Sequence, residues 1–288
     1  MIITKITGGL GNQMFQYAYG RKLAMEWNMP LKLDRSELQG NRLATPRKFE
    51  LDHFNVVVDF PTAAELKAVK LDEEHGVVNK VLMKLKQRGL PLQSSHILEG
   101  QPLQKKNDIY LDGYWQSEKY FNDIAALIRK EFTPRNGWDK ANKEVLVSIQ
   151  NTEAVSIHVR RGDYVTNAVA NSYHGTCTPE YYQEAVAYIA QRVQRPEYFV
   201  FSDDLEWCRE HLDFGGRPAH FIGHNGGDKA FMDIMLMRNC RHHIIANSSF
   251  SWWGAWLNER VDKMVIAPKR WFTQKDDNNI VPESWIRI

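Results

Sequence analysis

Apolar segments of strand length alternate with helix-like segments along most of this 288-residue chain. In its second half, strands are expected at 154–159 and 198–201, with a helix between them from Pro179 to about Val193. Thr178 is a favoured N-cap for that helix, and proline is favoured at a first helical position. This alternation predicts a mostly parallel sheet with helices on both faces. Ligands of such sheets bind beyond the carboxyl ends of the strands.

The length of the chain suits two domains of about 100–150 residues each. Signals of regular structure weaken between residues 41 and 113, and a boundary is expected near 136–151. We therefore expect one α/β domain over residues 1–150 and another over 151–288. The remaining expected elements are strands at 2–7, 31–33, 221–223 and 243–246, and helices at 12–27, 114–130, from 204, at 229–239 and at 252–259.

Charge and cysteine content exclude several classes of protein. Lys and Arg (37) nearly balance Asp and Glu (35), which gives no indication of nucleic-acid binding. Three well-separated cysteines without a C-x-x-C pair predict neither a disulfide framework nor a zinc site, and are interpreted as small apolar residues. No signal peptide or membrane span is recognisable, so a cytoplasmic location is expected. The basic, amphipathic segment 77–88 is interpreted as a solvated helix face, with peripheral contact to a membrane as the alternative.

A glycine-rich turn follows the first expected strand and opens the next helix. Free N–H groups at such a turn attract anions or polar substrates, which makes Gly9, Gly11, Asn12 and Gln13 candidate ligand-binding residues. A dinucleotide fingerprint is one alternative. It lacks the third glycine, since Met14 stands there, although Asp34 at the end of the next strand could hold a ribose. A tight turn without a ligand is the other alternative.

The segment 156–164 carries the most informative residues. Strand alternation places His158 and Arg160 on the same face, at the carboxyl end of the strand. The planar fork of arginine suits a pyrophosphate, whose negative charge grows when it is the leaving group of a transfer reaction. Arg161 is expected to pair with an acid such as Asp163. The alternative interpretation of the two arginines is a pair of surface charges.

Two further segments place polar residues just after apolar strands. Ser202 and Asp203 follow one strand, and either form part of a site or cap a helix, since Asp203 stands three residues before Glu206. After another strand, hydroxyls and N–H groups can bind phosphate oxygens, or Ser249 or Ser251 merely caps a helix. Trp252 and Trp256 share a helix face, where core packing is favoured over sugar stacking. The candidate residues of this last segment are Asn247, Ser248 and Ser249.

Five stretches together resemble the bacterial α-1,2-fucosyltransferases, which form glycosyltransferase family eleven and are related to the animal H blood-group enzymes. The stretches are GGLGNQMFQYA from Gly8, GYWQSEKYF from Gly113, HVRRGDY from His158, FSDD from Phe201 and NSSFSWWGAWL from Asn247. The resemblance implies a GT-B fold of two Rossmann-like domains with the active site in the cleft between them. Residues 1–150 would form the acceptor side and residues 151–288 would bind GDP-fucose.

The resemblance also implies an inverting reaction that needs no metal or other cofactor. L-Fucose would move from GDP-β-L-fucose to the 2-hydroxyl of a galactose-terminated oligosaccharide. Arg160 would bind the β-phosphate with His158 beside it, and Asp233 would read the guanine edge. Related α-1,6-fucosyltransferases carry a catalytic glutamate where this chain has Ala168. The base therefore cannot be transferred by resemblance, and Asp163 is either the base or a support for the arginine loop.

The acceptor is less well defined by the sequence. Tyr114 and Trp115 are candidates to stack on the acceptor sugar, and a core role for either is the alternative. Two other functions remain open at this point. Nine tryptophans would suit a carbohydrate-binding protein without catalysis, and the glycine turn would suit a nicotinamide-dependent dehydrogenase.

Overall fold

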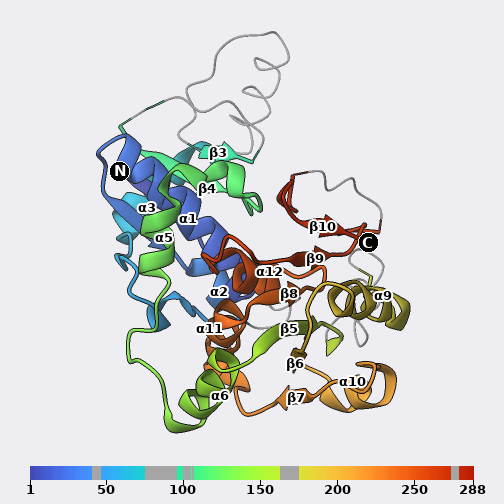
Figure 1. Cartoon of the computed structure of the whole chain (residues 1–288). Coiled ribbons are helices and arrows are strands. Elements are labelled where there is room, and N and C mark those ends of the chain that lie inside the picture. Colours follow the sequence, from blue (N-terminus) through green and yellow to red (C-terminus); the bar gives the residue numbers. More distant parts are fainter. Residues whose placement is uncertain (41–46, 75–95, 100–104, 106, 163–174, 274–278) are drawn as a thin grey trace. The chain divides into compact units, whose positions relative to one another are not determined.

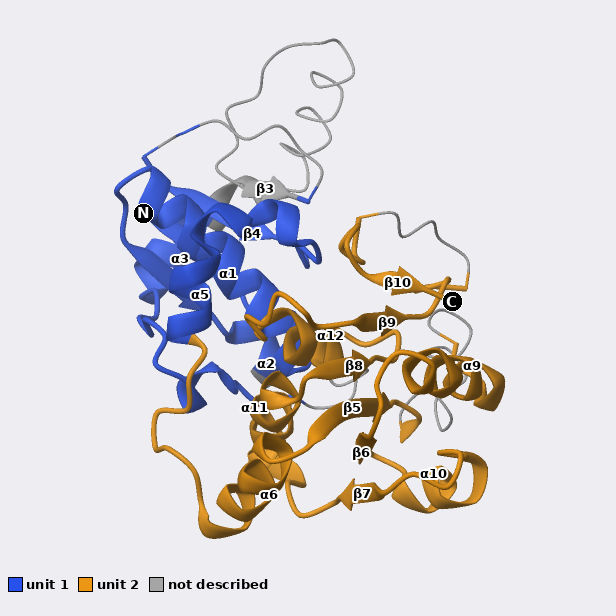
Figure 2. Cartoon of the chain, in the orientation of Figure 1, with its two compact units in different colours: residues 1–131 blue, residues 132–288 orange. Residues whose placement is uncertain are grey.

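The computed structural model describes residues 1–40, 47–74, 96–99, 105, 107–162, 175–273 and 279–288 (Figure 1). The chain forms two compact units, Met1–Glu131 and Phe132–Ile288 (Figure 2). This division differs from the predicted boundary after residue 150, because α6 (Lys140–Gln150) packs with β5 (Glu153–Val159) and α11 (Phe231–Asn239). No helix in the described ranges is both long and apolar enough to cross a membrane. The basic segment 77–88 lies outside the described residues.

The first unit contains a four-stranded parallel sheet in the order β2-β1-β4-β3. β4 is not among the expected strands, and only the end of the helix expected at 114–130 is α-helical. The strands are β1 (Ile2–Lys5), β2 (Leu31–Asp34), β3 (His96–Leu98) and β4 (Ile109–Asp112). The helices are α1 (Leu10–Glu26), α2 (Ser36–Gly40), α3 (Ala63–Glu74) and α5 (Ala125–Glu131), with 3-10 turns at Leu51–His53, Glu118–Tyr120 and Asn122–Ile124.

Alternate residues of β1 contact helices on opposite faces of this sheet. Ile3 packs with Val69 of α3 and with Tyr110 of β4. Thr4 points to the other face, where α1 lies so close that a Cβ added to Gly20 would overlap the Thr4 side chain. Gly20 therefore allows a closer approach of helix and strand than any other residue would.

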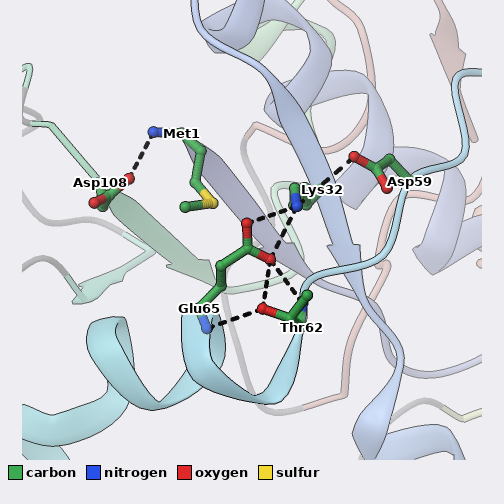
Figure 3. Close-up of polar contacts among 6 residues, drawn as sticks. All are labelled: Met1, Lys32, Asp59, Thr62, Glu65 and Asp108. Carbon is green, nitrogen blue, oxygen red and sulfur yellow. Dashed lines mark hydrogen bonds and ion pairs between the residues drawn. The ribbon is translucent and has the colours of Figure 1, made fainter.

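A polar cluster fixes the start of α3 to the sheet (Figure 3). The backbone N of Thr62 donates to a carboxylate oxygen of Glu65 at 2.7 Å, and the Thr62 hydroxyl accepts from the Glu65 backbone N at 3.2 Å. This reciprocal pair is a capping box. Lys32 Nζ on β2 also donates to both carboxylate oxygens of Glu65, at 2.7 and 2.9 Å. The bond from Lys32 is the main cause that lowers the pKa of Glu65 to about 2.

The second unit contains a six-stranded parallel sheet in the order β10-β9-β8-β5-β6-β7. From β5 the chain winds outward through β6 and β7, then returns to the other side of β5 and winds outward again. The direction of winding therefore reverses between β5 and β8, where open α/β sheets bind their ligands. The strands after β5 are β6 (Pro196–Ser202), β7 (Ala219–Ile222), β8 (His242–Ile244), β9 (Val265–Ala267) and β10 (Ile286–Arg287).

Helices cover both faces of this second sheet. α9 (Pro179–Ala190) and α10 (Leu205–His211) lie on one side, and α6, α11 and α12 (Ser249–Trp256) lie on the other (Figure 1). Val155, Ile157 and Val159 of β5 form a buried cluster with residues of α9. Ser156 and His158 point to the opposite face and are buried as well, which confirms the predicted alternation. The strands and helices expected in this half are present, with ends shifted by a few residues.

A buried chain of hydrogen bonds joins β5, β8 and the residues after α12. Asn258 Nδ2 lies 2.9 Å from His243 Nε2, and His243 Nδ1 lies 2.8 Å from Ser156 Oγ. The Asn258 amide has a fixed orientation, because its Oδ1 accepts from the Arg260 backbone N and its Nδ2 donates to the Cys240 carbonyl. Nε2 of His243 therefore accepts, and its Nδ1–H donates to Ser156. Burial lowers the pKa of His243 well below 6.5.

This arrangement predicts that acid destabilises the protein. Below about pH 6.5 the unfolded chain binds a proton at His243 while the folded protein does not. The free energy of unfolding should therefore fall as the pH decreases from 6.5, by up to about 1.4 kcal/mol per pH unit for this histidine. Denaturant unfolding at pH 7.5, 6.5 and 5.5 measures the slope. A His243→Asn variant should be less stable at pH 7.5 but show a shallower slope, and an unchanged slope would contradict the assignment.

Candidate functional site

Two arginines follow β5 at the reversal of winding, and two aspartates follow the neighbouring β6. Arg160 Nη1 lies 2.7 Å from Asp203 Oδ2, and the Arg161 backbone N donates to Asp203 Oδ1 at 2.8 Å. Arg161 Nε donates to Asp204 Oδ2 at 3.1 Å, while its guanidinium lies 4.2 Å from the centroid of the Trp207 ring. The end of β6 therefore orients both guanidinium groups at the carboxyl edge of the sheet.

The glycine after the two arginines allows Asp203 to reach Arg160. A Cβ added to Gly162 would lie 2.6 Å from Asp203 Oδ2, so a larger residue would displace the carboxylate. Asp203 does not cap α10, which settles one of its two predicted alternatives. Asp204 is the cap, since its Oδ1 accepts from the Trp207 backbone N at 3.1 Å. The Ser202 hydroxyl in turn accepts from the Asp204 backbone N at 2.9 Å.

Arg161 pairs with an acid, as predicted, but the partner found among the described residues is Asp204. The suggested partner Asp163 lies outside the described residues, and its predicted catalytic role is therefore not tested. The local reason for the observed pairing is that β5 and β6 are adjacent and in register to Val159 and Ser202. The residues that follow the two strands consequently meet.

His158 lies in β5, two residues before Arg160, and is only 5% exposed. Its Nδ1 has no hydrogen-bond partner within the part of the chain that the structure describes. Its ring centroid lies 5.5 Å from that of Phe250 in the first turn of α12. Burial lowers the pKa of His158 to about 4, so the imidazole is neutral at pH 7. A buried neutral ring can present one donor and one acceptor to a ligand.

The segment between β8 and α12 lies at the same edge of the sheet. Ser248 caps α12, since its Oγ accepts from the Phe250 backbone N at 3.3 Å. The predicted alternative of a cap at Ser249 or Ser251 is therefore wrong. Ser249 is half-buried at the first helical position, and the hydroxyl of Ser251 donates to the Ser248 carbonyl.

Two other features of this segment are structural. Asn247 is buried, and its Nδ2 donates to the carbonyls of Gly175 and Trp271 at 3.3 and 3.2 Å. The Asn247 amide thus holds two neighbouring loops together. Trp252 and Trp256 are stacked with ring centroids 5.8 Å apart, and both are buried. Core packing, the favoured interpretation of these tryptophans, is confirmed.

Asp233 lies in the first turn of α11 and is half-buried. Its Oδ1 accepts a hydrogen bond of 2.8 Å from Asn225 Nδ2. Burial raises the pKa of Asp233 to about 7, and the bond from Asn225 opposes this shift. Asn225 pairs in turn with buried Asn142. Neither asparagine can be recognised from the sequence, because they stand 83 residues apart and belong to no recognisable motif.

The glycine turn of the first unit precedes α1 as predicted. Gly8 has a φ of +76°, a conformation that favours glycine, and Gly9 is the N-cap position of α1. Gly11 is buried in the first turn. Asn12 is half-buried, and its Oδ1 accepts from Gln116 Nε2 at 2.8 Å. The start of a helix of 17 residues, without an acidic residue in its first turn, suits an anion or a polar ligand.

Gln13 supports this turn from within the unit. Its Nε2 donates to the carbonyls of Gly8 and Lys48 at 3.0 and 2.8 Å, and its Oε1 accepts from the Glu50 backbone N at 3.0 Å. Gln13 is fully buried. Its polar atoms thus join two segments of the unit, and this structural role was not predicted.

Asp34 is used within the first sheet. Its Oδ2 accepts from the Tyr110 hydroxyl at 2.8 Å and its Oδ1 accepts from the Ser36 backbone N at 3.0 Å. The residue is buried. These internal bonds argue against the dinucleotide interpretation, in which this carboxylate would hold a ribose.

The two aromatic acceptor candidates differ in their surroundings. Trp115 is buried, with its ring centroid 4.5 Å from that of Tyr19 and 5.5 Å from that of Tyr120. The core alternative therefore holds for Trp115. Tyr114 is 47% exposed, and its backbone N donates to Glu99 Oε2 at 2.8 Å. Of the two residues, Tyr114 is the one that can stack on a sugar.

The edge of the second sheet combines groups that suit a diphosphate. Arg160 supplies a planar cation, the first turn of α12 supplies N–H groups, and His158 supplies a neutral ring. A cation fixed at this point stabilises negative charge that develops on a departing phosphate. The arrangement can therefore support transfer of a group from a nucleoside diphosphate.

Comparison with solved structures identifies the fold. A NodZ α-1,6-fucosyltransferase soaked with GDP-fucose matches with a TM-score of 0.50 at 16% identity, over 89% of this chain and 91% of that chain. Arabidopsis thaliana FUT1 in complex with GDP matches with a TM-score of 0.50 at 13% identity, over 99% and 75%. At such low identity these matches show a shared α/β fold.

Comparison of sequences identifies the family. An alpha-1,2-colitosyltransferase of Escherichia coli is 37% identical over 100% of this chain and 99% of its own length. The Escherichia coli O-antigen biosynthesis glycosyltransferase WbnK is 33% identical over 98% and 99%. Galactoside alpha-(1,2)-fucosyltransferase 1 of Leontocebus fuscicollis is 28% identical over 51% and 42%. The family model described as glycosyl transferase family 11 matches residues 66–288, and the chain therefore belongs to that family of glycosyltransferases.

Proposed function

We propose that the protein is an inverting, metal-independent α-1,2-fucosyltransferase that transfers L-fucose from GDP-β-L-fucose to a galactoside. The observation that carries this proposal is the oriented Arg160 guanidinium beside buried His158 at the reversal of winding. Membership of family 11 supports the reaction class, and two solved fucosyltransferases of the same fold were soaked with GDP-fucose or solved in complex with GDP. The proposal keeps the two-domain GT-B organisation expected from the sequence.

In this proposal the bond between fucose C1 and the β-phosphate oxygen breaks as the acceptor 2-oxygen bonds to C1 from the opposite face. Inversion converts the β-linked donor into an α-linked product, and GDP leaves. Arg160 stabilises the charge that grows on the β-phosphate, and N–H groups at the start of α12 assist. The remaining donor contacts proposed are with Ser202, Ser249 and Asp233, together with Gly9, Gly11 and Asn12 of the first unit.

The acceptor hydroxyl must lose its proton, and the transition state resembles an oxocarbenium ion. The proton can therefore leave late, and a weak carboxylate base is sufficient. Asp163 remains the proposed base or, alternatively, a support for the arginine loop. We propose that Tyr114 stacks on the galactose ring of the acceptor, since aromatic faces of exposed tyrosines suit sugar rings.

The 37% identical relative favours a second candidate for the donor sugar. Colitose is L-fucose without the 3-hydroxyl, so both sugars could use the same phosphate site. Mass detection of product, with GDP-fucose and GDP-colitose each tested against lactose and a panel of galactosides, would distinguish the two donors. We expect higher kcat/KM with GDP-fucose. A clear preference for GDP-colitose would reassign the donor, and absence of transfer from both would refute the proposal.

Arg160→Ala should abolish transfer, because it removes stabilisation of the transition state that typically amounts to several kcal/mol. Arg160→Lys should restore little activity, since lysine lacks the planar fork. Asp203→Asn should reduce kcat/KM less than Arg160→Ala does, because it alters the orientation of the guanidinium but keeps the charge. If Arg160→Ala keeps more than about a tenth of wild-type kcat/KM, less than ~1.4 kcal/mol is lost and the phosphate site is misplaced.

Activity should persist in excess EDTA, because Arg160 and the start of α12 provide the positive and donor groups that a divalent ion would otherwise provide. Initial rates with and without chelator measure this directly. A modest stimulation by Mg²⁺ would be compatible, since the ion can bind released GDP. Complete loss of activity in EDTA that Mn²⁺ or Mg²⁺ restores would contradict the metal-independent mechanism.

A further inference from the structure

Two buried asparagines connect helix α6 to the carboxylate of Asp233. Asn142 Nδ2 donates to Asn225 Oδ1 and Asn225 Nδ2 donates to Asn142 Oδ1, each at 2.8 Å, so the two amides form a reciprocal pair. The second hydrogen of Asn225 Nδ2 is donated to Asp233 Oδ1, also at 2.8 Å. Both asparagines are at most 3% exposed. Buried polar groups of this kind require complete hydrogen bonding, and here the last bond ends on a half-buried acid.

The direction of this chain is determined at its other end. Asp139 caps α6, and its Oδ1 accepts from Asn142 Nδ2 at 3.1 Å. Hydrogen bonds, the one from the Asn142 backbone N first, lower the pKa of Asp139 to about 2, so this carboxylate can only accept. The atom of Asn142 beside Asp139 must therefore be Nδ2, which donates to both Asp139 and Asn225. This leaves Oδ1 of Asn142 to accept from Nδ2 of Asn225. Asn225 in turn has to present Nδ2, a donor, to Asp233.

His224 contacts the pair from a different side. Its Nε2 lies 3.1 Å from Asn142 Oδ1, the oxygen that also accepts from Asn225. An Nε2–H group on His224 would donate to that oxygen, while the four amide N–H groups of the pair are already bonded to Asp139, to Asp233 and to each other. Asp139 is therefore the group that determines the orientation of the pair.

We propose that the Asn142–Asn225 pair is a positioning device that orients the Asp233 carboxylate toward the nucleobase and so determines which base the donor site accepts. This inference rests on the proposed function, in which Asp233 accepts hydrogen bonds from guanine N1–H and from its 2-amino group. A carboxylate that rotates freely loses the geometry for two parallel bonds, whereas one fixed at Oδ1 keeps it. Both asparagines are buried, and Asn225 bonds directly to Asp233, so in this inference they act through Asp233.

The same contact affects the proton of Asp233. A protonated carboxyl group cannot accept both guanine N–H groups, and burial raises the pKa of Asp233 to about 7 while the Asn225 bond lowers it. The titratable or charged groups on the elements packed against α11 are Lys140, Lys143 and Glu144 of α6 and Asp228 and Lys229 of the 3-10 turn Gly227–Lys229, with His224 and Asp139 beside them. Lys229 and Asp139 pair at 3.1 Å. None of them contributes to the pKa shift of Asp233. GDP affinity should therefore fall by up to about tenfold per pH unit below pH 7.

The test compares the dissociation constants of GDP and inosine diphosphate, which lacks the 2-amino group, by calorimetry at pH 6, 7 and 8. The wild-type protein should prefer GDP by about tenfold or more, the usual value of a hydrogen bond to a charged group. Asn225→Ala should bind GDP about tenfold more weakly at pH 7 and nearly lose the preference over inosine diphosphate. Its affinity should begin to fall at higher pH than in the wild type.

His224→Ala is the matched control. It removes one bond to the same Asn142 oxygen, but Asp139 still determines the orientation of both amides. Its preference for GDP should equal that of the wild type. Thermal unfolding checks that the variants are folded, and Asn225→Ser replaces Asn225→Ala in the same measurements if the alanine variant does not fold.

The outcomes separate the inference from the proposed function. A folded Asn225 variant with the wild-type preference and pH dependence would show that the pair is only structural, and would overturn the inference alone. An equal loss of preference in His224→Ala would also overturn it, because the effect would not depend on the bond to Asp233. A wild-type protein that does not bind GDP would refute the proposed function itself.

Discussion

The confinement of β5 determines the chemistry of the second unit. This strand is hydrogen-bonded to β6 on one side and to β8 on the other, and helices cover both of its faces. From Ala154 to Val159 its side chains are buried, and Arg160, which follows the strand at its carboxyl end, is partly exposed. Winding reverses beside β5, which is the position at which open α/β sheets bind their ligands.

Charge at this edge is balanced before any ligand binds. Arg160 and Arg161 each pair with an aspartate that follows β6, so the cluster carries no net charge among these four groups. A phosphate that binds here places negative charge next to the Asp203 carboxylate. A guanidinium that is held in place offsets the resulting repulsion better than one that moves. The close packing of Asp203 on Gly162 supplies that rigidity. Preorganised groups of this kind need no reorganisation during the reaction.

Although it does not predict α6, β9 or β10, the sequence predicts most strands and helices of the second unit, because buried parallel strands and capped helices leave local patterns. It predicts His158 and Arg160 for the same reason. The sequence does not predict the partners of these residues. The register of two strands determines that Asp204 caps α10 while Asp203 pairs with Arg160. The packing of α6 determines that Asn225 contacts Asn142. Such contacts are properties of the tertiary structure and leave no local signal.

The nucleotide and the sugar differ in how strongly the fold constrains them. In the proposed site, the phosphate groups would be bound by a strand end and a helix start, which the topology of the sheet places together and which tolerate much sequence divergence. Fucose and colitose differ by one hydroxyl, and a relative 37% identical over the full chain is a colitosyltransferase. A site that hydrogen-bonds this hydroxyl rejects the deoxy sugar strongly, because its own polar groups are left unpaired. One substitution near the sugar can reverse that preference while the phosphate site stays unchanged, so family membership constrains the leaving group more tightly than the transferred sugar.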